Sequence, residues 1–141
     1  MGQIYADIFT IKEHHLDTFG HINNATYLQL FEQARWDLIV ERGFDFNKMR
    51  KEALGPVILE VNVKFLQEIT LREQICIGTE VLDYKGKIGR LKQTVFKANG
   101  AQIDNKKPCC EAIFTFGLFD IKERKLVNPT DDWLKAIDYQ V

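Results

Sequence analysis

The stretch Asp17–Gly43, DTFGHINNATYLQLFEQARWDLIVERG, decides the fold, because a polar loop in it runs directly into the longest helical pattern of the chain. Apolar residues recur with the spacing of one helix face at positions 27, 28, 30, 31, 34, 38 and 39. We predict a helix over 25–42, about 27 Å long at 1.5 Å per residue, with Gly43 as its C-terminal stop. Trp36 and Val40 widen the apolar arc, so we expect protein on more than one side of this helix.

Outside this helix the hydrophobic period changes to two, which is typical of β-strands. The pattern predicts strands over 4–12, from about 56 to 65, 74–84, 88–97 and 110–118, and a short helix over about 131–137. The turn Tyr84–Lys87 and the pair Asn99-Gly100 join consecutive strands as hairpins, which favours antiparallel pairing. In the strand that starts near Pro56 we expect one buried face, made of Val57, Leu59, Val61, Val63 and Phe65.

One long apolar helix after the first of five long strands predicts an α+β architecture. We expect a curved antiparallel sheet of about five strands wrapped around one long central helix. A chain of 141 residues with 45% hydrophobic content suits one core, so residues 1–141 are expected to form a single domain. A small sheet leaves open edges, and a homodimer that joins two sheets edge to edge is therefore expected.

The charge balance excludes a strong global attraction to polyanions. Nineteen Lys plus Arg against twenty Asp plus Glu give a formal net charge of -1, so neither nucleic acid nor a membrane surface is an expected partner. The start MGQIYADIFTIKE lacks the pattern of a signal peptide, and no stretch approaches the roughly 18 apolar residues of a membrane span. We expect a cytoplasmic protein.

The chain contains three cysteines and three histidines. Cys76, Cys109 and Cys110 make a poor disulfide framework and are expected to be reduced and buried in strands. His14 and His15 are adjacent at a strand end, where side chains point to opposite sides, and no acidic partner has diagnostic spacing. We therefore expect no bound metal.

A resemblance to a known family rests on two segments. Asp17–Tyr27, DTFGHINNATY, followed by Glu32–Arg35, EQAR, resembles the D-x-x-G-H-V-N-N-x-x-Y … E-x-A-R signature of hotdog-fold acyl-CoA thioesterases, most of all the 4-hydroxybenzoyl-CoA thioesterase and YbgC type. Ile22 replaces valine in the core motif, and Leu66–Thr70 lacks the proline and Gly-Asp that many relatives carry there. The resemblance implies a homodimer or homotetramer that hydrolyses an acyl-CoA, or an acyl-carrier-protein thioester, without a cofactor.

The loop is suited to that chemistry. Thioester hydrolysis needs a base or nucleophile on one side and polarisation of the carbonyl oxygen on the other. Asp17 lies six to eight residues before the helix, and Gly20 lets the loop turn back. The first turn of the helix offers unpaired N–H groups and the positive end of its dipole. In the family interpretation Asp17 is either nucleophile or general base, whereas spacing alone also fits an aspartate that only shapes a turn.

Other residues are candidates for supporting roles. The supporting loop and helix N-terminus comprise Gly20, His21, Asn23, Asn24 and Tyr27. His21 either orients the substrate or loop or is simply packed, either asparagine can cap the helix, and Tyr27 falls on the apolar side. Glu32 and Arg35, three apart, are expected to form a local ion pair. For the phosphates of coenzyme A the resemblance points to the basic hairpin residues Lys85, Lys87 and Arg90.

Two alternatives stay open from the sequence. Fold does not fix function, so a catalytically idle hotdog domain that binds acyl-CoA or serves in assembly is the alternative from another class. Phenylalanines at 31, 65, 114, 116 and 119 either line a tunnel or fill the core, which leaves the acyl group unspecified.

Overall fold

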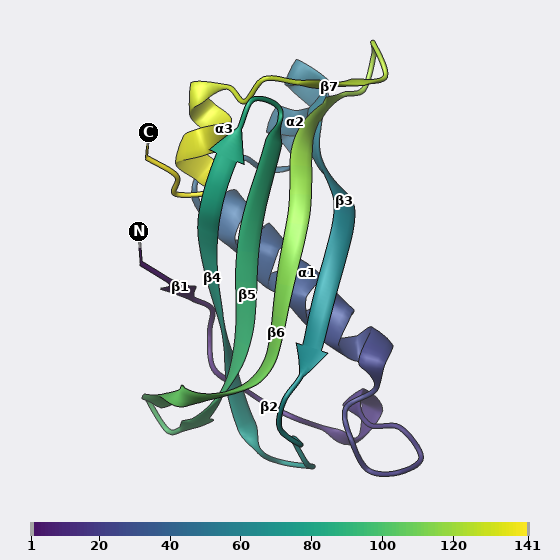
Figure 1. Cartoon of the computed structure of the whole chain (residues 1–141), viewed down its shortest axis with the longest axis vertical. Helices are drawn as coiled ribbons and strands as arrows, with labels where there is room; N and C mark the ends of the chain where they lie inside the picture. The colour runs from purple at the N-terminus through teal and green to yellow at the C-terminus, as the bar shows by residue number, and fades with distance from the viewer. Residues whose placement is uncertain (1, 141) are drawn as a thin grey trace.

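The computed structural model describes residues 2–140 (Figure 1). In chain order the elements are β1 (Ile4–Tyr5), β2 (Phe9–Thr10), the 3-10 helix η1 (Glu13–His15), α1 (Asn24–Glu41), α2 (Phe46–Glu52), β3 (Leu54–Phe65), β4 (Gln74–Lys85), β5 (Ile88–Asn99), β6 (Gln102–Asp120), β7 (Lys125–Val127) and α3 (Asp131–Ala136).

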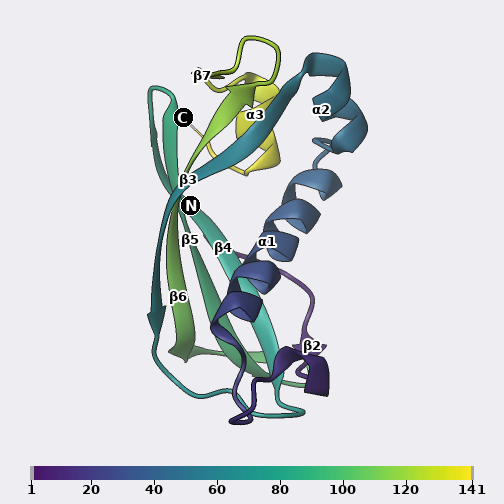
Figure 2. The ribbon, with the colours of Figure 1, turned by 90° about the vertical axis from the view of Figure 1, so that its right-hand side faces the viewer.

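All strands join one antiparallel sheet in the order β1-β4-β5-β6-β3, with β2 also paired to β4 and β7 to β6. The sheet curls, and α1 crosses its concave side (Figures 1 and 2). The α+β architecture and both predicted hairpins are confirmed, since β4 turns into β5 and β5 into β6 without a crossover. β3 is left as an open edge of the sheet.

The core lies between α1 and the sheet. Phe31 of α1 is fully buried and meets Phe114 of β6 edge to face, with ring centroids 5.9 Å apart. Burial of one such side chain contributes about 2–3 kcal/mol to folding. At the other end of α1, Phe44 packs on Trp133 of α3, so the short C-terminal helix closes the core there.

The register of β3 differs from the predicted alternation because the strand carries a bulge. Ile58 lies opposite Phe116 and Glu60 opposite Thr115, which leaves Leu59 without a partner position. An extra residue reverses the alternation of faces. The expected single face that holds both Val57 and Leu59 is therefore wrong, and Ile58 faces the same side as Phe116 instead.

The predicted burial of that face is also wrong. The exposed apolar residues of β3 are Ile58, Leu59, Val61 and Phe65. They are exposed because β3 is an edge strand and α1 covers it only in part.

Three local differences concern loops and short elements. The predicted strand over 4–12 is two short pieces, because the pairing with β4 changes register by one residue between Tyr5, opposite Gly78, and Phe9, opposite Ile75. His14 and His15 belong to η1, where their ring centroids are 4.0 Å apart and the ring planes are tilted by 42°, so the expectation that they point to opposite sides is wrong. Neither α2 nor β7 was predicted, since each is too short to show a period.

Candidate functional site

The loop between η1 and α1 holds the carboxylate of Asp17 in a fixed orientation. Its Oδ1 accepts hydrogen bonds from the backbone N–H groups of Phe19 at 2.9 Å and His21 at 3.2 Å. The backbone N–H of Asp17 donates to the carbonyl of His21 at 2.8 Å, and Gly20 has a φ of 82°, which favours glycine. No hydrogen bond found among residues 2–140 uses Oδ2, so this oxygen remains free to meet a substrate or a water molecule.

The helix α1 begins at Asn24, seven residues after Asp17. Asn23 caps it, because its side chain accepts a hydrogen bond from the N–H of Ala25 at 2.8 Å. The N–H groups of Thr26 and Tyr27 both donate to the carbonyl of Asn23. Within the described residues the N–H of Asn24 has no acceptor. This amide, at the positive end of the helix dipole, is available to polarise a carbonyl oxygen.

A shallow hollow lies beside this helix end, between α1 and the segment after β3. We call it the loop hollow; it is lined by His21, Ile22, Asn24, Tyr27, Phe65, Leu66, Gln67, Glu68 and Ile69. The Nε2 of His21 contacts Oε1 of Glu68, and both side chains are more than half exposed. Asp17 does not line the hollow, but its Oδ1 is bonded to the backbone of His21, which does.

Glu68 is a neighbour that the sequence analysis did not find. It lies 47 positions after His21, and only the fold brings the two together. No spacing rule connects them. Tyr27, by contrast, is buried as expected, and its ring packs on Phe65 with centroids 5.4 Å apart. Burial raises the pKa of the Tyr27 phenol well above its usual range, so it stays protonated.

The basic hairpin is not brought to the loop within one chain. Lys85, Lys87 and Arg90 lie at the β4–β5 turn, at the opposite end of the sheet from the loop before α1 (Figure 1). Arg90 is already bound to Asp83, with Nη2 2.6 Å from Oδ2. The role of these residues at coenzyme A phosphates stays a prediction.

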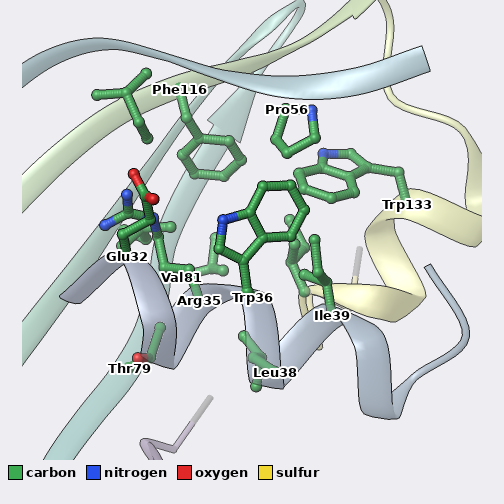
Figure 3. A pocket seen from close by; sticks show the side chains of 13 residues that line it. Glu32, Arg35, Trp36, Leu38, Ile39, Pro56, Thr79, Val81, Phe116 and Trp133 are labelled. Carbon is green, nitrogen blue, oxygen red and sulfur yellow. The ribbon is translucent and has the colours of Figure 1, made fainter. Parts of the chain in front are cut away.

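Arg35 does not form the expected ion pair with Glu32. Among residues 2–140 no ion pair joins the two, and the Arg35 guanidinium instead turns inward over the Phe114 ring, 4.2 Å from its centroid. Its Nη1 donates to Oε1 of the fully buried Gln93 at 2.9 Å. Burial lowers the pKa of Arg35 to about 10, because the charge has left water without a bonded carboxylate. Figure 3 shows Glu32 and Arg35 together at one side of a cavity.

Other predicted features have simple outcomes. Cys76, Cys109 and Cys110 are free and buried, as expected, and burial raises the pKa of each thiol. In the part of the chain that the structure describes, no three His, Cys, Asp or Glu side chains gather closely enough to hold a metal ion. No helix within residues 2–140 is long and apolar enough to cross a membrane.

Comparisons with known proteins match nearly the whole chain. The long-chain acyl-CoA thioesterase FadM of Escherichia coli (strain K12) is 29% identical over 115 residues, which are 82% of this chain and 83% of FadM. The chloroplastic acyl-acyl carrier protein thioesterase ATL2 of Arabidopsis thaliana is 24% identical over 120 residues, 85% of this chain and 61% of ATL2.

Solved structures share the fold. The probable thioesterase YbaW of Escherichia coli superposes with a TM-score of 0.78 at 23% identity, over 98% of this chain and 97% of its own. A Staphylococcus aureus protein solved in complex with CoA has a TM-score of 0.83 at 16% identity, over 96% of this chain and 82% of its own. The model of the Thioesterase-like superfamily matches residues 11–137. This chain, with its curled antiparallel sheet around one helix, therefore belongs to the Thioesterase-like superfamily and has the hotdog fold.

Proposed function

We propose that this protein hydrolyses the thioester bond of an acyl-CoA, releasing free acid and coenzyme A, and that Asp17 carries the reaction. Three findings support the proposal: membership of the superfamily, the similarity to FadM, which is named as an acyl-CoA thioesterase, and the shared fold with a protein solved with CoA.

The observation that carries it is the arrangement of Asp17 and the helix end. One carboxylate oxygen is bonded to two backbone N–H groups of its own loop, while Oδ2 makes no bond to the described residues. The free N–H of Asn24 lies at the start of the helix that the same loop leads into. A carboxylate oxygen and an oxyanion donor are the two parts that acyl transfer from sulfur needs.

Asp17 acts in one of two ways. As nucleophile, Oδ2 attacks the carbonyl carbon, the C–S bond breaks, coenzyme A leaves as thiolate, and water then hydrolyses the mixed anhydride. As general base, Oδ2 takes a proton from a water whose oxygen attacks the carbonyl carbon, and that proton then reaches the departing thiolate.

Turnover in H2 18O tests for the nucleophilic route, because heavy oxygen in Asp17 excludes a role as general base alone. If water attacks the anhydride at the Asp17 carbonyl, a nucleophilic Asp17 gains heavy oxygen, seen as a mass increase of the peptide that contains it after many turnovers. A general base leaves this peptide unlabelled and places the heavy oxygen in the acid product from the first turnover.

Substrate panels test the proposal and its variants. Release of free thiol is measured with short, long and aromatic acyl-CoAs and with the same acyl groups on acyl carrier protein, since ATL2 is named for carrier-protein substrates. Preference for 4-hydroxybenzoyl-CoA would support the narrower family type that the motif at 17–27 resembles. Binding of acyl-CoA without hydrolysis of any thioester would overturn the proposal in favour of an idle binding module.

The exposed edge strand supports a second copy as part of the same proposal. β3 is long and presents apolar side chains at Leu59 and Val61, which a soluble protein covers or pairs. Pairing β3 with β3 of another copy would extend the sheet and cover these residues. Sedimentation equilibrium should give at least twice the monomer mass of 16.4 kDa, and a monomer at micromolar concentration would contradict the pairing.

A further inference from the structure

A cavity of about 240 Å³ lies between the middle of α1, the sheet and α3 (Figure 3). It shares no lining residue with the loop hollow, so it is a second space, apart from the loop that holds Asp17. Most of its wall is apolar, including Trp36, Ile39, Ile58, Phe116, Trp133 and Ile137. An apolar cavity of about 150 Å³ holds benzene, so this larger cavity has room for one aromatic ring with a short side chain.

The charged groups of the cavity wall lie together at one side (Figure 3). Among the described residues that line the cavity, Arg35 carries the only positive charge and Glu32 the only negative one. The Arg35 guanidinium has one hydrogen bond to residues 2–140, from Nη1 to the side chain of Gln93. A guanidinium has five N–H donors, so most of them lack an acceptor in this part of the chain. A partly buried cation without a bonded carboxylate is suited to an anionic ligand.

A second donor without an acceptor lies across the cavity from Arg35, on Trp133 of α3 (Figure 3). Trp133 is 2% exposed, and its Nε1–H makes no hydrogen bond within residues 2–140. The buried hydroxyl of Tyr84 is close to this N–H but is not aligned to accept from it. A buried donor without an acceptor is unfavourable. The described part of the chain thus leaves polar groups unsatisfied at both ends of the cavity, which favours a ligand that brings acceptor atoms.

We propose that this cavity is a second ligand site, which binds a small aromatic acid with its carboxylate on Arg35 and its ring against Trp36 and Trp133. A planar guanidinium matches a carboxylate, because two parallel N–H groups can donate to its two oxygens. The ring suits a wall that contains two indoles and the ring of Phe116, since aromatic rings pack favourably edge to face or offset. The proposal is independent of the proposed function, because it uses no residue of the loop before α1.

Glu32 makes the cavity selective among anions. An inorganic phosphate has no apolar surface to cover Trp36, and Glu32 would repel its second charge. The Glu32 side chain is exposed, so it can turn into solvent when an anion with one charge enters. Glu32 therefore weakens the binding of an acid without preventing it, and removal of its charge should strengthen binding.

The first experiment compares 3-phenylpropionate with its neutral amide, 3-phenylpropanamide, by isothermal titration calorimetry at neutral pH. A ligand of this size binds with a dissociation constant on the order of 0.1–1 mM. The acid should bind at least about tenfold more tightly than the amide, the effect of one charge-assisted hydrogen bond. Trp36 and Trp133 are the only tryptophans, so their fluorescence should change with the same dissociation constant. Equal affinities for acid and amide, no binding of the acid, or unchanged fluorescence would overturn the proposal.

Two variants on one helix should change the affinity for 3-phenylpropionate in opposite directions. Arg35→Gln keeps a donor for Gln93 but removes the charge, and it should weaken binding of the acid at least about tenfold. Glu32→Gln should strengthen it about twofold to fivefold, the range for an exposed charge. The affinity for the amide should stay within about twofold of wild type in both. Glu32 is exposed, so Glu32→Gln keeps the test decisive even if Arg35→Gln does not fold; unchanged or weaker acid binding in Glu32→Gln would contradict the proposal.

A second pair of variants, on β3, tests the location of the ligand. Ile58 lines the cavity and is 42% exposed, so Ile58→Trp adds an indole at its open side. Leu59→Trp adds the same side chain at the neighbouring bulge, where the residue does not line the cavity. Calorimetry should show at least about tenfold weaker binding of 3-phenylpropionate in Ile58→Trp and binding within about twofold of wild type in Leu59→Trp. Equal affinities in the two variants, with unchanged circular dichroism, would overturn the location in this cavity.

Discussion

Gln93 links α1 to the centre of the sheet, and its loss should be costly. The side chain is fully buried and makes three hydrogen bonds: Oε1 accepts from Arg35 Nη1 at 2.9 Å, and Nε2 donates to the Phe31 carbonyl and to Thr79 Oγ1, each at 3.0 Å. The substitution Gln93→Leu keeps the approximate volume and removes all three bonds. It leaves a partly buried guanidinium without its acceptor.

The magnitude follows from the type of each bond. A hydrogen bond to a charged group contributes about 1.5–3 kcal/mol, and a neutral one about 1 kcal/mol. The Phe31 carbonyl keeps its helical acceptor role and the Thr79 hydroxyl can rotate, so most of the cost falls on Arg35. We expect Gln93→Leu to lower the free energy of unfolding by about 2–4 kcal/mol. With a urea m-value of about 2 kcal/mol/M, the midpoint should fall by about 1–2 M.

Urea unfolding at one fixed protein concentration measures this, because stability depends on concentration if the chain self-associates. Gln33→Leu is the matched control: the side-chain amide of Gln33 donates to Asp37 at 2.9 Å on the exposed face of the same helix. It should change stability by less than about 0.5 kcal/mol. A double-mutant cycle with Arg35→Met should give a coupling above about 1 kcal/mol. A loss below about 0.5 kcal/mol for Gln93→Leu would refute the reasoning.

Three further predictions follow from the loop and the buried thiols. Gly20→Ala should lower the free energy of unfolding by about 1–2 kcal/mol, because a φ of 82° is a left-handed conformation that strains alanine. No atom lies within 4 Å of the added carbon, so no steric clash adds to this strain, and an unchanged midpoint in urea unfolding would contradict the prediction. Burial raises the pKa of Cys110 to about 12, and the other two cysteines are also buried, so no thiol should react with a disulfide reagent at pH 8 until urea is added. Rapid reaction of the native protein would show that the thiols are not buried. Burial lowers the pKa of His15 from 6.5, and the neutral ring accepts a hydrogen bond from the Lys12 N–H. The neutral ring therefore contributes stability above pH 6.5, and this stability is lost as the pH falls through the lowered pKa; an NMR titration midpoint of His15 at or above 6.5 would be inconsistent with this.

The elements with a strong period could be predicted from the sequence. The helix from Asn24 to Glu41 lies within one residue of its predicted bounds, and the hairpin at Asn99-Gly100 occurs where the turn residues place it. Local chemistry also limited the cap to Asn23 or Asn24, of which the structure uses Asn23, and it indicated a glycine turn at position 20. These features depend on neighbours in sequence, which a pattern can show.

Features that depend on distant partners could not be predicted. The Glu68 side chain meets His21 across 47 residues, and Arg35 prefers the buried amide of Gln93, 58 positions away, to the carboxylate one helical turn before it. The bulge at Leu59 changes which apolar residues of β3 face the cavity, and no residue type in this strand predicts a bulge. The spacing of three between Glu32 and Arg35 suggested an ion pair, but α1 packs on the sheet so that Arg35 bonds to Gln93 of β5 instead.

The central claim is that the carboxylate of Asp17 carries thioester hydrolysis, and the most direct test compares two isosteric variants. Asp104 is the matched control, because its Oδ1 also accepts from the N–H two residues later, at Lys106, but within the strand β6 and away from the loop before α1. With hexadecanoyl-CoA, the account predicts that Asp17→Asn lowers kcat by at least about 100-fold, the scale of general base catalysis, while Asp104→Asn keeps the wild-type rate. Circular dichroism and sedimentation mass should be unchanged in both. An Asp17→Asn protein that retains its fold and hydrolyses hexadecanoyl-CoA within threefold of the wild-type rate would contradict the account.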